Sequence, residues 1–174
     1  MNSTIRQDEI NKALWAACDT FRGTISADTY KDFILTMLFL KYLSDVWQDH
    51  YEHYQQEYGD EPDLIVELMQ NERFTLPEIS LTDDEGKVTD IFRADFYSLY
   101  DRRHTPGNGE RFDMVLHAIE EANGTKLNNV FQDISFNTNK LGDEKEKNDV
   151  LRFLLEDFAS PVLNLRPSRV GDLD

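Results

Sequence analysis

The chain has 174 residues, of which 40% are hydrophobic and 11% aromatic, so it is long and apolar enough to fold around one core instead of staying disordered. Its formal net charge is −16, from 34 acidic and 18 basic residues, and this charge repels nucleic-acid phosphates over most of the surface. A single cysteine excludes an internal disulfide, and the first residues lack the apolar core of a secretory signal, so we expect a cytoplasmic protein.

A first amphipathic helix is predicted from Ile10 to Phe21, with Gly23 just beyond its end. The most apolar stretch, residues 30–48, follows it. Its apolar side chains recur at helical spacing and widen almost all the way round, so it must be covered on several sides. Lys41 and Asp45 interrupt it too early for a membrane span. We therefore predict the central helix of a helical domain. The side chains that we expect to be among the most buried are Phe33, Ile34, Met37, Leu38 and Leu154.

The helical pattern continues in polar form to Gly59 and places His50, His53 and Glu57 on one face. Such a face could hold a metal ion. A fourth ligand and a His-Glu-x-x-His pattern are both missing, so a solvated helix end is the favoured interpretation. No metal site is predicted.

A short helix is expected to start at Pro62, and the pattern then changes to period two between residues 74 and 92. The alternation, broken by the turn Asp83-Asp84-Glu85-Gly86, predicts a small β-hairpin. The acidic turn lacks the spacing of a calcium loop and is interpreted as a solvated turn.

A short helix over residues 94–102 leads into a basic, glycine-rich loop over residues 102–109. Gly107-Asn108-Gly109 is a weak phosphate-binding signal without its usual strand and lysine, so a turn into the next helix is favoured. That helix should stop at Asn123-Gly124. The last long helix should open in the charged run at residues 143–147 and end at Ser160-Pro161.

Several segments together resemble a known family. In the first half they are Leu14-Trp15, Phe21-Arg22-Gly23-Thr24-Ile25-Ser26, Tyr30-Lys31-Asp32-Phe33-Ile34-Leu35 and Leu38-Phe39-Leu40-Lys41-Tyr42-Leu43-Ser44-Asp45. In the second half they are Phe131-Gln132-Asp133-Ile134-Ser135-Phe136-Asn137, Lys140-Leu141-Gly142, Leu154-Leu155-Glu156-Asp157-Phe158 and Leu165-Arg166-Pro167-Ser168-Arg169-Val170-Gly171. They resemble the N-terminal domain of the modification subunit of type I restriction–modification systems.

This resemblance implies a full-length DNA adenine-N6 methyltransferase that uses S-adenosylmethionine. It also implies a DNA specificity subunit and a restriction subunit as partners, and duplex DNA bound through the assembled complex. The family's Asn-Pro-Pro-aromatic motif and glycine-rich cofactor turn are absent from this sequence. No catalytic or cofactor-binding residue can therefore be assigned here. We expect a mainly α, bundle-like domain with a hairpin insertion over residues 1–160. Residues 161–174 would be a linker toward a catalytic domain absent from this chain.

The domain's expected role is to help subunit assembly and the enclosure of DNA without being catalytic by itself. Candidate contacts to DNA or a partner are Arg102, Arg103, Arg166 and Arg169, although each could simply be a surface or capping arginine. An alternative is a free-standing acidic interaction protein, such as a DNA mimic or an adaptor. A small metal enzyme at His50, His53 and Glu57 is the least favoured class.

Overall fold

The computed structural model describes residues 7–20, 26–128, 130–131 and 134–168. Its α-helices are α1 (Gln7–Thr20), α2 (Ala27–Tyr58), α3 (Pro62–Gln70), α4 (Phe96–Asp101), α5 (Asn108–Asn123) and α6 (Glu144–Phe158). One hairpin, β1 (Glu78–Thr82) and β2 (Val88–Arg93), and the short turns η1 (Gly124–Lys126), η2 (Asn139–Leu141) and η3 (Pro161–Leu163) complete the described elements. The predicted mainly α fold with a hairpin is confirmed. No helix in these described ranges is both long and apolar enough to cross a membrane.

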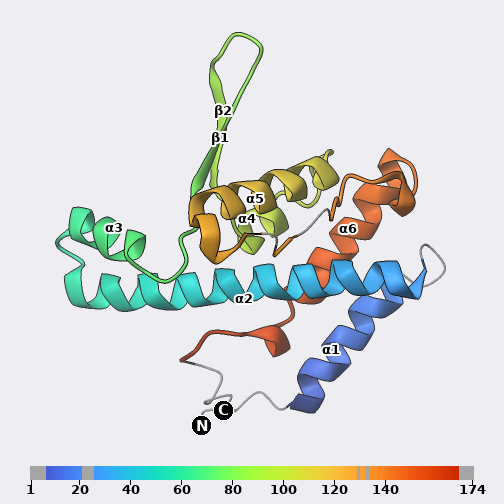
Figure 1. The fold of residues 1–174 in the computed structure, drawn as a ribbon, viewed down its shortest axis with the longest axis horizontal. Coiled ribbons are helices and arrows are strands. Elements are labelled where there is room, and N and C mark those ends of the chain that lie inside the picture. The colour runs from blue at the N-terminus through green and yellow to red at the C-terminus, as the bar shows by residue number, and fades with distance from the viewer. Residues whose placement is uncertain (1–6, 21–25, 129, 132–133, 169–174) are drawn as a thin grey trace.

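Helix α2 is the central helix, as predicted. It has 32 residues, which corresponds to roughly 48 Å at 1.5 Å per residue. In Figure 1, α3 lies beside one end of α2, whereas α1 and α6 cross it near the other end. Phe33, Ile34 and Met37 are buried as expected. Leu38 is only half-buried against the core, so its placement among the most buried side chains is wrong. The innermost stripe passes instead through Leu40 and Leu43, because helices α4 to α6 cover that side.

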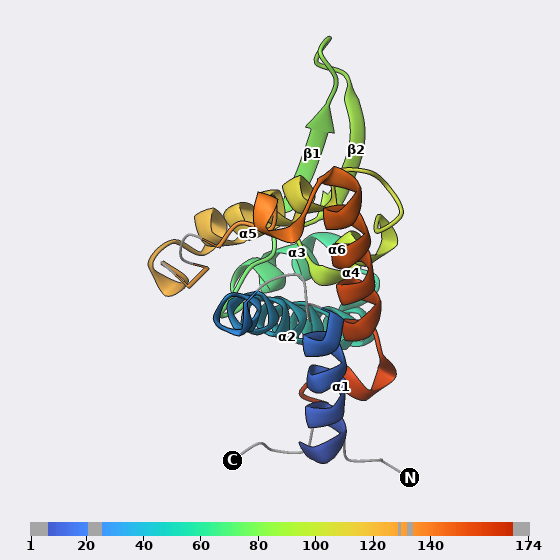
Figure 2. The same ribbon diagram turned by 90° about the vertical axis from the view of Figure 1, so that its right-hand side faces the viewer.

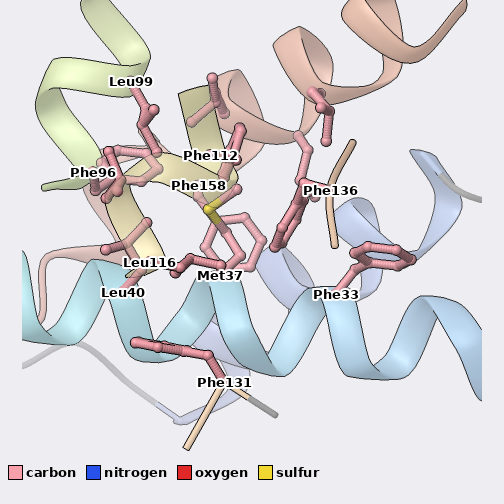
Figure 3. Close-up of a cluster of buried hydrophobic side chains, with 14 of the residues drawn as sticks. Phe33, Met37, Leu40, Phe96, Leu99, Phe112, Leu116, Phe131, Phe136 and Phe158 are labelled. Carbon is pink, nitrogen blue, oxygen red and sulfur yellow. The ribbon is translucent and has the colours of Figure 1, made fainter. Parts of the chain in front are cut away.

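The core lies where α2, α5, α6 and the segment before η2 converge (Figure 3). Phe136 lies at its centre. Its ring stacks on Phe112 with 4.6 Å between ring centroids and meets Phe33 edge-on at 4.9 Å. Leu154 is fully buried nearby, as the sequence predicted. Large rings packed in offset and edge-on pairs supply much of the apolar area that such a core removes from water.

The hairpin projects from the helical body (Figures 1 and 2). Its turn forms where predicted: the Asp83 carboxylate accepts the amides of Glu85 and Lys87, and Gly86 supplies a φ of 81°. The early part of the predicted alternation, residues 74–77, is not a strand. The Asn123 side chain instead bonds both the amide and the carbonyl of Thr75, at 2.8 Å each, and ties this segment to the end of α5.

The turn before α5 confirms the favoured interpretation of the glycine-rich loop. Gly107 is the N-cap residue with a φ of 87°, a conformation that side chains other than glycine rarely adopt. Gly109 lies in the first turn of α5 against the backbone of Phe136, where an added Cβ would come within 2.8 Å of the carbonyl oxygen. The two glycines thus serve a turn and a close backbone approach.

Several predicted boundaries are confirmed. Helix α3 starts at Pro62, α5 ends at Asn123 before Gly124, and α6 opens with a capping box in which Asp143 and Glu146 satisfy each other's amides. The predicted helix end at Gly23 lies outside the described residues. Residues 161–168, expected to begin a linker, pass beneath α2, with Leu163 fully buried. The boundary between a domain and a linker at residue 161 stays a prediction.

Candidate functional site: a polar ladder on the central helix

Four charged residues of α2 face the C-terminal segment of the described chain. Lys41, Asp45, Asp49 and Glu52 are spaced three or four residues apart, so they share one face of the helix. Each contacts the segment 163–168, which Figure 1 shows as the red trace below α2. We call these four residues the α2 ladder.

The inner half of the ladder is a buried ion pair. The Lys41 Nζ atom lies 2.5 Å from Asp45 Oδ2, and the two side chains are 4% and 0% exposed. Nζ also donates to the carbonyl oxygen of Leu163 at 2.7 Å, while Oδ2 accepts the amide of Leu165 at 2.8 Å. A buried pair is tolerated only when further hydrogen bonds satisfy both charges, and here the segment's backbone supplies them.

Helix α4 closes the same cluster from the other side. The Tyr97 hydroxyl donates to Asp45 Oδ1, and the Lys41 amine lies 5.6 Å from the ring centroid of Phe96 and 5.5 Å from that of Tyr97. Ser44 connects the two helices directly, because its hydroxyl accepts the Phe96 amide at 2.9 Å. The cluster therefore joins α2, α4 and the segment after η3.

Burial shapes the protonation of this cluster. Removal from water lowers the pKa of Lys41, while the Asp45 carboxylate opposes that change by favouring the ammonium form. The pKa of Tyr97 is raised, first by burial and then by its hydrogen bond to Asp45. A neutral hydroxyl is thus kept as a donor. The arrangement is suited to fixing the chain's path after η3.

The outer half of the ladder holds the segment at the surface. The amide and hydroxyl of Ser168 both donate to the Asp49 carboxylate, at 3.1 and 2.5 Å. Arg166 Nη1 lies 2.6 Å from Glu52 Oε2, and this bond raises the pKa of Arg166. Arg166 therefore pairs with a carboxylate of α2, and its predicted contact with DNA or a partner stays a prediction.

The other predicted arginines pair with different elements. Arg102 forms a two-pronged contact with Asp90 of β2, at 2.7 and 2.9 Å, and its guanidinium lies 4.5 Å from the ring centroid of Phe92. Arg103 pairs with Glu156 of α6 at 3.1 Å. Arg169 lies outside the described residues. Arg102 and Arg103 are thus held against β2 and α6, whereas Arg166, in the segment after η3, is held against α2.

Arg111 supports the loop that carries Arg102 and Arg103, and sequence reasoning did not single it out. Its buried guanidinium donates to Asn108 Oδ1 and to the carbonyl of Pro106, at 2.9 Å each. Burial is the main cause that lowers its pKa. Its guanidinium carries five donors in a planar fork, so different nitrogens reach acceptors on two residues of the loop at once.

The weak metal candidate is divided between two contacts. His50 Nδ1 lies 3.0 Å from Glu72 Oε2 of the segment after α3, whereas His53 Nε2 lies 3.5 Å from Glu57 Oε2 on the exposed face of α2. Within the described ranges, no group of three or more His, Cys, Asp or Glu side chains is arranged to hold a metal ion.

Sequence reasoning also missed the ladder as a site. Its signal was present, because Lys41 and Asp45 are opposite charges one helical turn apart inside an otherwise apolar stretch. Charged residues are almost never fully buried unless they are paired. The pattern could therefore have marked Lys41 and Asp45 as a buried pair, although the segment that covers them could not have been named.

The sequence pattern of the HsdM N-terminal domain matches residues 10–158, which is most of the chain. The chain belongs to the HsdM N-terminal domain family. A search of curated proteins finds no match.

Among solved structures, this family member is similar to the type I restriction–modification system methyltransferase subunit from Streptococcus thermophilus. The TM-score is 0.60 at 22% sequence identity, over 87% of this chain and 34% of that one. The similarity shows a shared fold, and the chain spans about a third of that subunit's length.

Proposed function

We propose that this chain is the N-terminal module of a type I restriction–modification DNA adenine-N6 methyltransferase subunit, and that it helps subunit assembly and the enclosure of DNA. The observation that carries the proposal is the family match over residues 10–158. The fold shared with the Streptococcus thermophilus methyltransferase subunit supports it. In this proposal catalysis and S-adenosylmethionine binding belong to another domain.

The α2 ladder gives this module a defined task. It holds the segment 163–168 against α2 through one buried pair and two surface contacts. A chain that continues past this segment would leave the domain in a fixed direction. We infer that the ladder orients this module relative to the catalytic domain. The expected partners of the whole subunit are the specificity and restriction subunits.

Contact with DNA should be local. Phosphates are repelled by a net charge of −16, and the guanidinium groups of Arg102, Arg103 and Arg166 already face carboxylates. A phosphate could take the place of such a carboxylate, because both anions accept the same two-pronged arginine contact. The three arginines and Arg169 therefore remain the proposed contact residues.

The test uses the methyltransferase subunit that contains this domain, assembled with its specificity subunit. Arg166→Ala with Arg169→Ala should lower DNA affinity or the rate of methyl transfer, and should leave the free energy of unfolding within about 1 kcal/mol of the parent, because exposed ion pairs contribute little. Lys12→Ala with Lys145→Ala, two exposed lysines of α1 and α6, removes the same charge as a control.

Unchanged affinity and unchanged methylation would show that the tail is a spacer, without affecting family membership. The second candidate function, an acidic interaction protein such as a DNA mimic, is favoured by the net charge of −16. It predicts that the chain alone displaces duplex DNA from a DNA-binding enzyme, an outcome that the module function does not require.

A further inference from the structure

A groove lies between the hairpin and α3, away from the α2 ladder. Its apolar lining comes from Trp47 and Tyr51 of α2, Val66 and Met69 of α3, and Leu76 and Pro77 before β1. Its volume of about 460 Å³ falls in the range of roughly 300–1,000 Å³ that is typical of ligand sites. In Figure 1 these elements meet at the corner where the hairpin rises beside α3.

The groove is formed by side chains that hold one another in place. The Trp47 ring stacks on Tyr51 with 5.0 Å between ring centroids and an angle of 12°. The Arg93 guanidinium lies 4.6 Å from the Trp47 centroid, donates to the carbonyl of Leu76 at 2.7 Å, and pairs with Glu78 at 3.3 Å. A preformed site of this kind loses little conformational freedom on binding. Val66, at 57% exposure, leaves an apolar side chain in contact with solvent at its edge.

The chain around the groove is strongly acidic. Residues 49–72, which run from the second half of α2 through α3, contain no lysine or arginine. Their eight acidic residues are Asp49, Glu52, Glu57, Asp60, Glu61, Asp63, Glu67 and Glu72. Asp49 and Glu52 belong to the α2 ladder, and Glu72 pairs with Tyr54 and His50, so the charge at the groove itself comes from α3. Asp63 and Glu67 lie one helical turn from Val66 and Gln70 on the exposed side of α3.

We propose that this groove binds a protein segment rich in lysine and arginine that carries one aliphatic or aromatic anchor. The acidic surroundings attract the cations and favour such partners over others, and the aromatic floor receives the anchor. Nucleic acid does not fit, because its phosphates meet the same negative charge. A second copy of this chain would bring a net charge of −16 to an acidic surface. The proposal goes beyond the module function and does not depend on it.

The test titrates the chain with the fluorescein-labelled peptide Lys-Lys-Lys-Phe-Lys-Lys-Lys and measures anisotropy at moderate salt. The chain has two tryptophans, so a Trp15→Phe background makes Trp47 the only intrinsic reporter of the groove. The peptide should bind and change the Trp47 emission. Replacing its Phe with Ser, or its lysines with Glu, should weaken binding by at least about tenfold.

The decisive variant is Val66→Lys, which places a cation at the edge of the groove on an exposed side chain that the core does not need. This variant should bind the peptide at least about tenfold more weakly than the parent. The control is Val130→Lys, which makes the same change at a side chain that is 45% exposed and outside the groove; it should bind the peptide like the parent. The proposal is overturned if Val66→Lys binds like the parent, if the Ser peptide binds as tightly, or if the Phe peptide does not bind. Two other results would also overturn the proposal, because they would identify a different occupant of the groove. One is self-association in sedimentation that Val66→Lys abolishes, and the other is displacement of the peptide by duplex DNA.

Discussion

Removing the amine of Lys41 should destabilise the protein more than any surface substitution. Lys41→Met keeps the side chain's length and deletes the two hydrogen bonds of Nζ, to Asp45 and to the Leu163 carbonyl. Asp45, whose side chain is fully buried, keeps only its neutral donors, the Leu165 amide and the Tyr97 hydroxyl. A buried charge that loses its partner typically costs about 3–5 kcal/mol. Because two donors to Asp45 remain, we expect a loss at the lower end of this range, about 3 kcal/mol.

The assay is urea unfolding followed by circular dichroism, with Lys145→Met, an exposed lysine of α6, as the control that should change stability by less than about 0.5 kcal/mol. Asp45→Asn should be similarly costly, because it leaves the Lys41 ammonium without its carboxylate. The double variant should cost less than the sum of the singles by about 0.5–3 kcal/mol. If Lys41→Met costs less than about 1 kcal/mol, or the two losses simply add, the ladder is not a coupled buried pair and the reasoning is refuted.

Three further outcomes are expected. The chain alone should bind duplex DNA weakly in a gel shift at ~150 mM salt. Each phosphate contact contributes only roughly −0.9 to the salt slope, and the chain has few arginines that could make such contacts. Tight binding would contradict this prediction. Calorimetry should detect no micromolar binding of S-adenosylmethionine to the chain, whose sequence lacks a glycine-rich strand–helix turn. The hydrogen bond that Tyr54 donates to Glu72 raises the pKa of Tyr54 from 10.0 to about 12. Because the folded state holds this proton to a higher pH than the unfolded state does, the pair stabilises the fold fully below pH 10, and this stabilisation is lost as the pH rises to about 12. Urea unfolding measured at several pH values should show this alkaline loss of stability, and Tyr54→Phe should remove the part that comes from Tyr54.

Local patterns predicted the elements of this fold well. Helix α2 follows from the apolar run, α3 from Pro62, and the hairpin from its alternation and acidic turn. The alternation failed at residues 74–77, because the side chain of Asn123, far along the chain, satisfies the backbone of Thr75 and replaces strand pairing there. Periodicity reports how side chains are spaced and gives no information about such distant partners.

The choice of the most buried stripe shows the same limit. Residues 30–48 are apolar on nearly every side, so spacing alone could not decide which stripe faces the core. The structure buries Leu40 fully and leaves Leu35 52% exposed, although the two have the same side chain. The difference comes from where α4, α5 and α6 pack, and Leu38 lies between the two extremes.

The α2 ladder was the hardest feature to predict, because its sequence signal is divided. Lys41 and Asp45 looked like interruptions of an apolar helix, and the segment after Pro161 showed no helical face. The two meet because the segment offers backbone groups, the Leu163 carbonyl and the Leu165 amide, across a separation of 122 and 120 residues. Backbone donors and acceptors are the same for almost every residue type, so no pattern of side chains could reveal them. The stretch with Lys41 and the stretch with Leu165 both belong to the segments that carry the family resemblance. In this structure they are in contact, and the second stretch supplies the backbone hydrogen bonds that a buried charge pair needs.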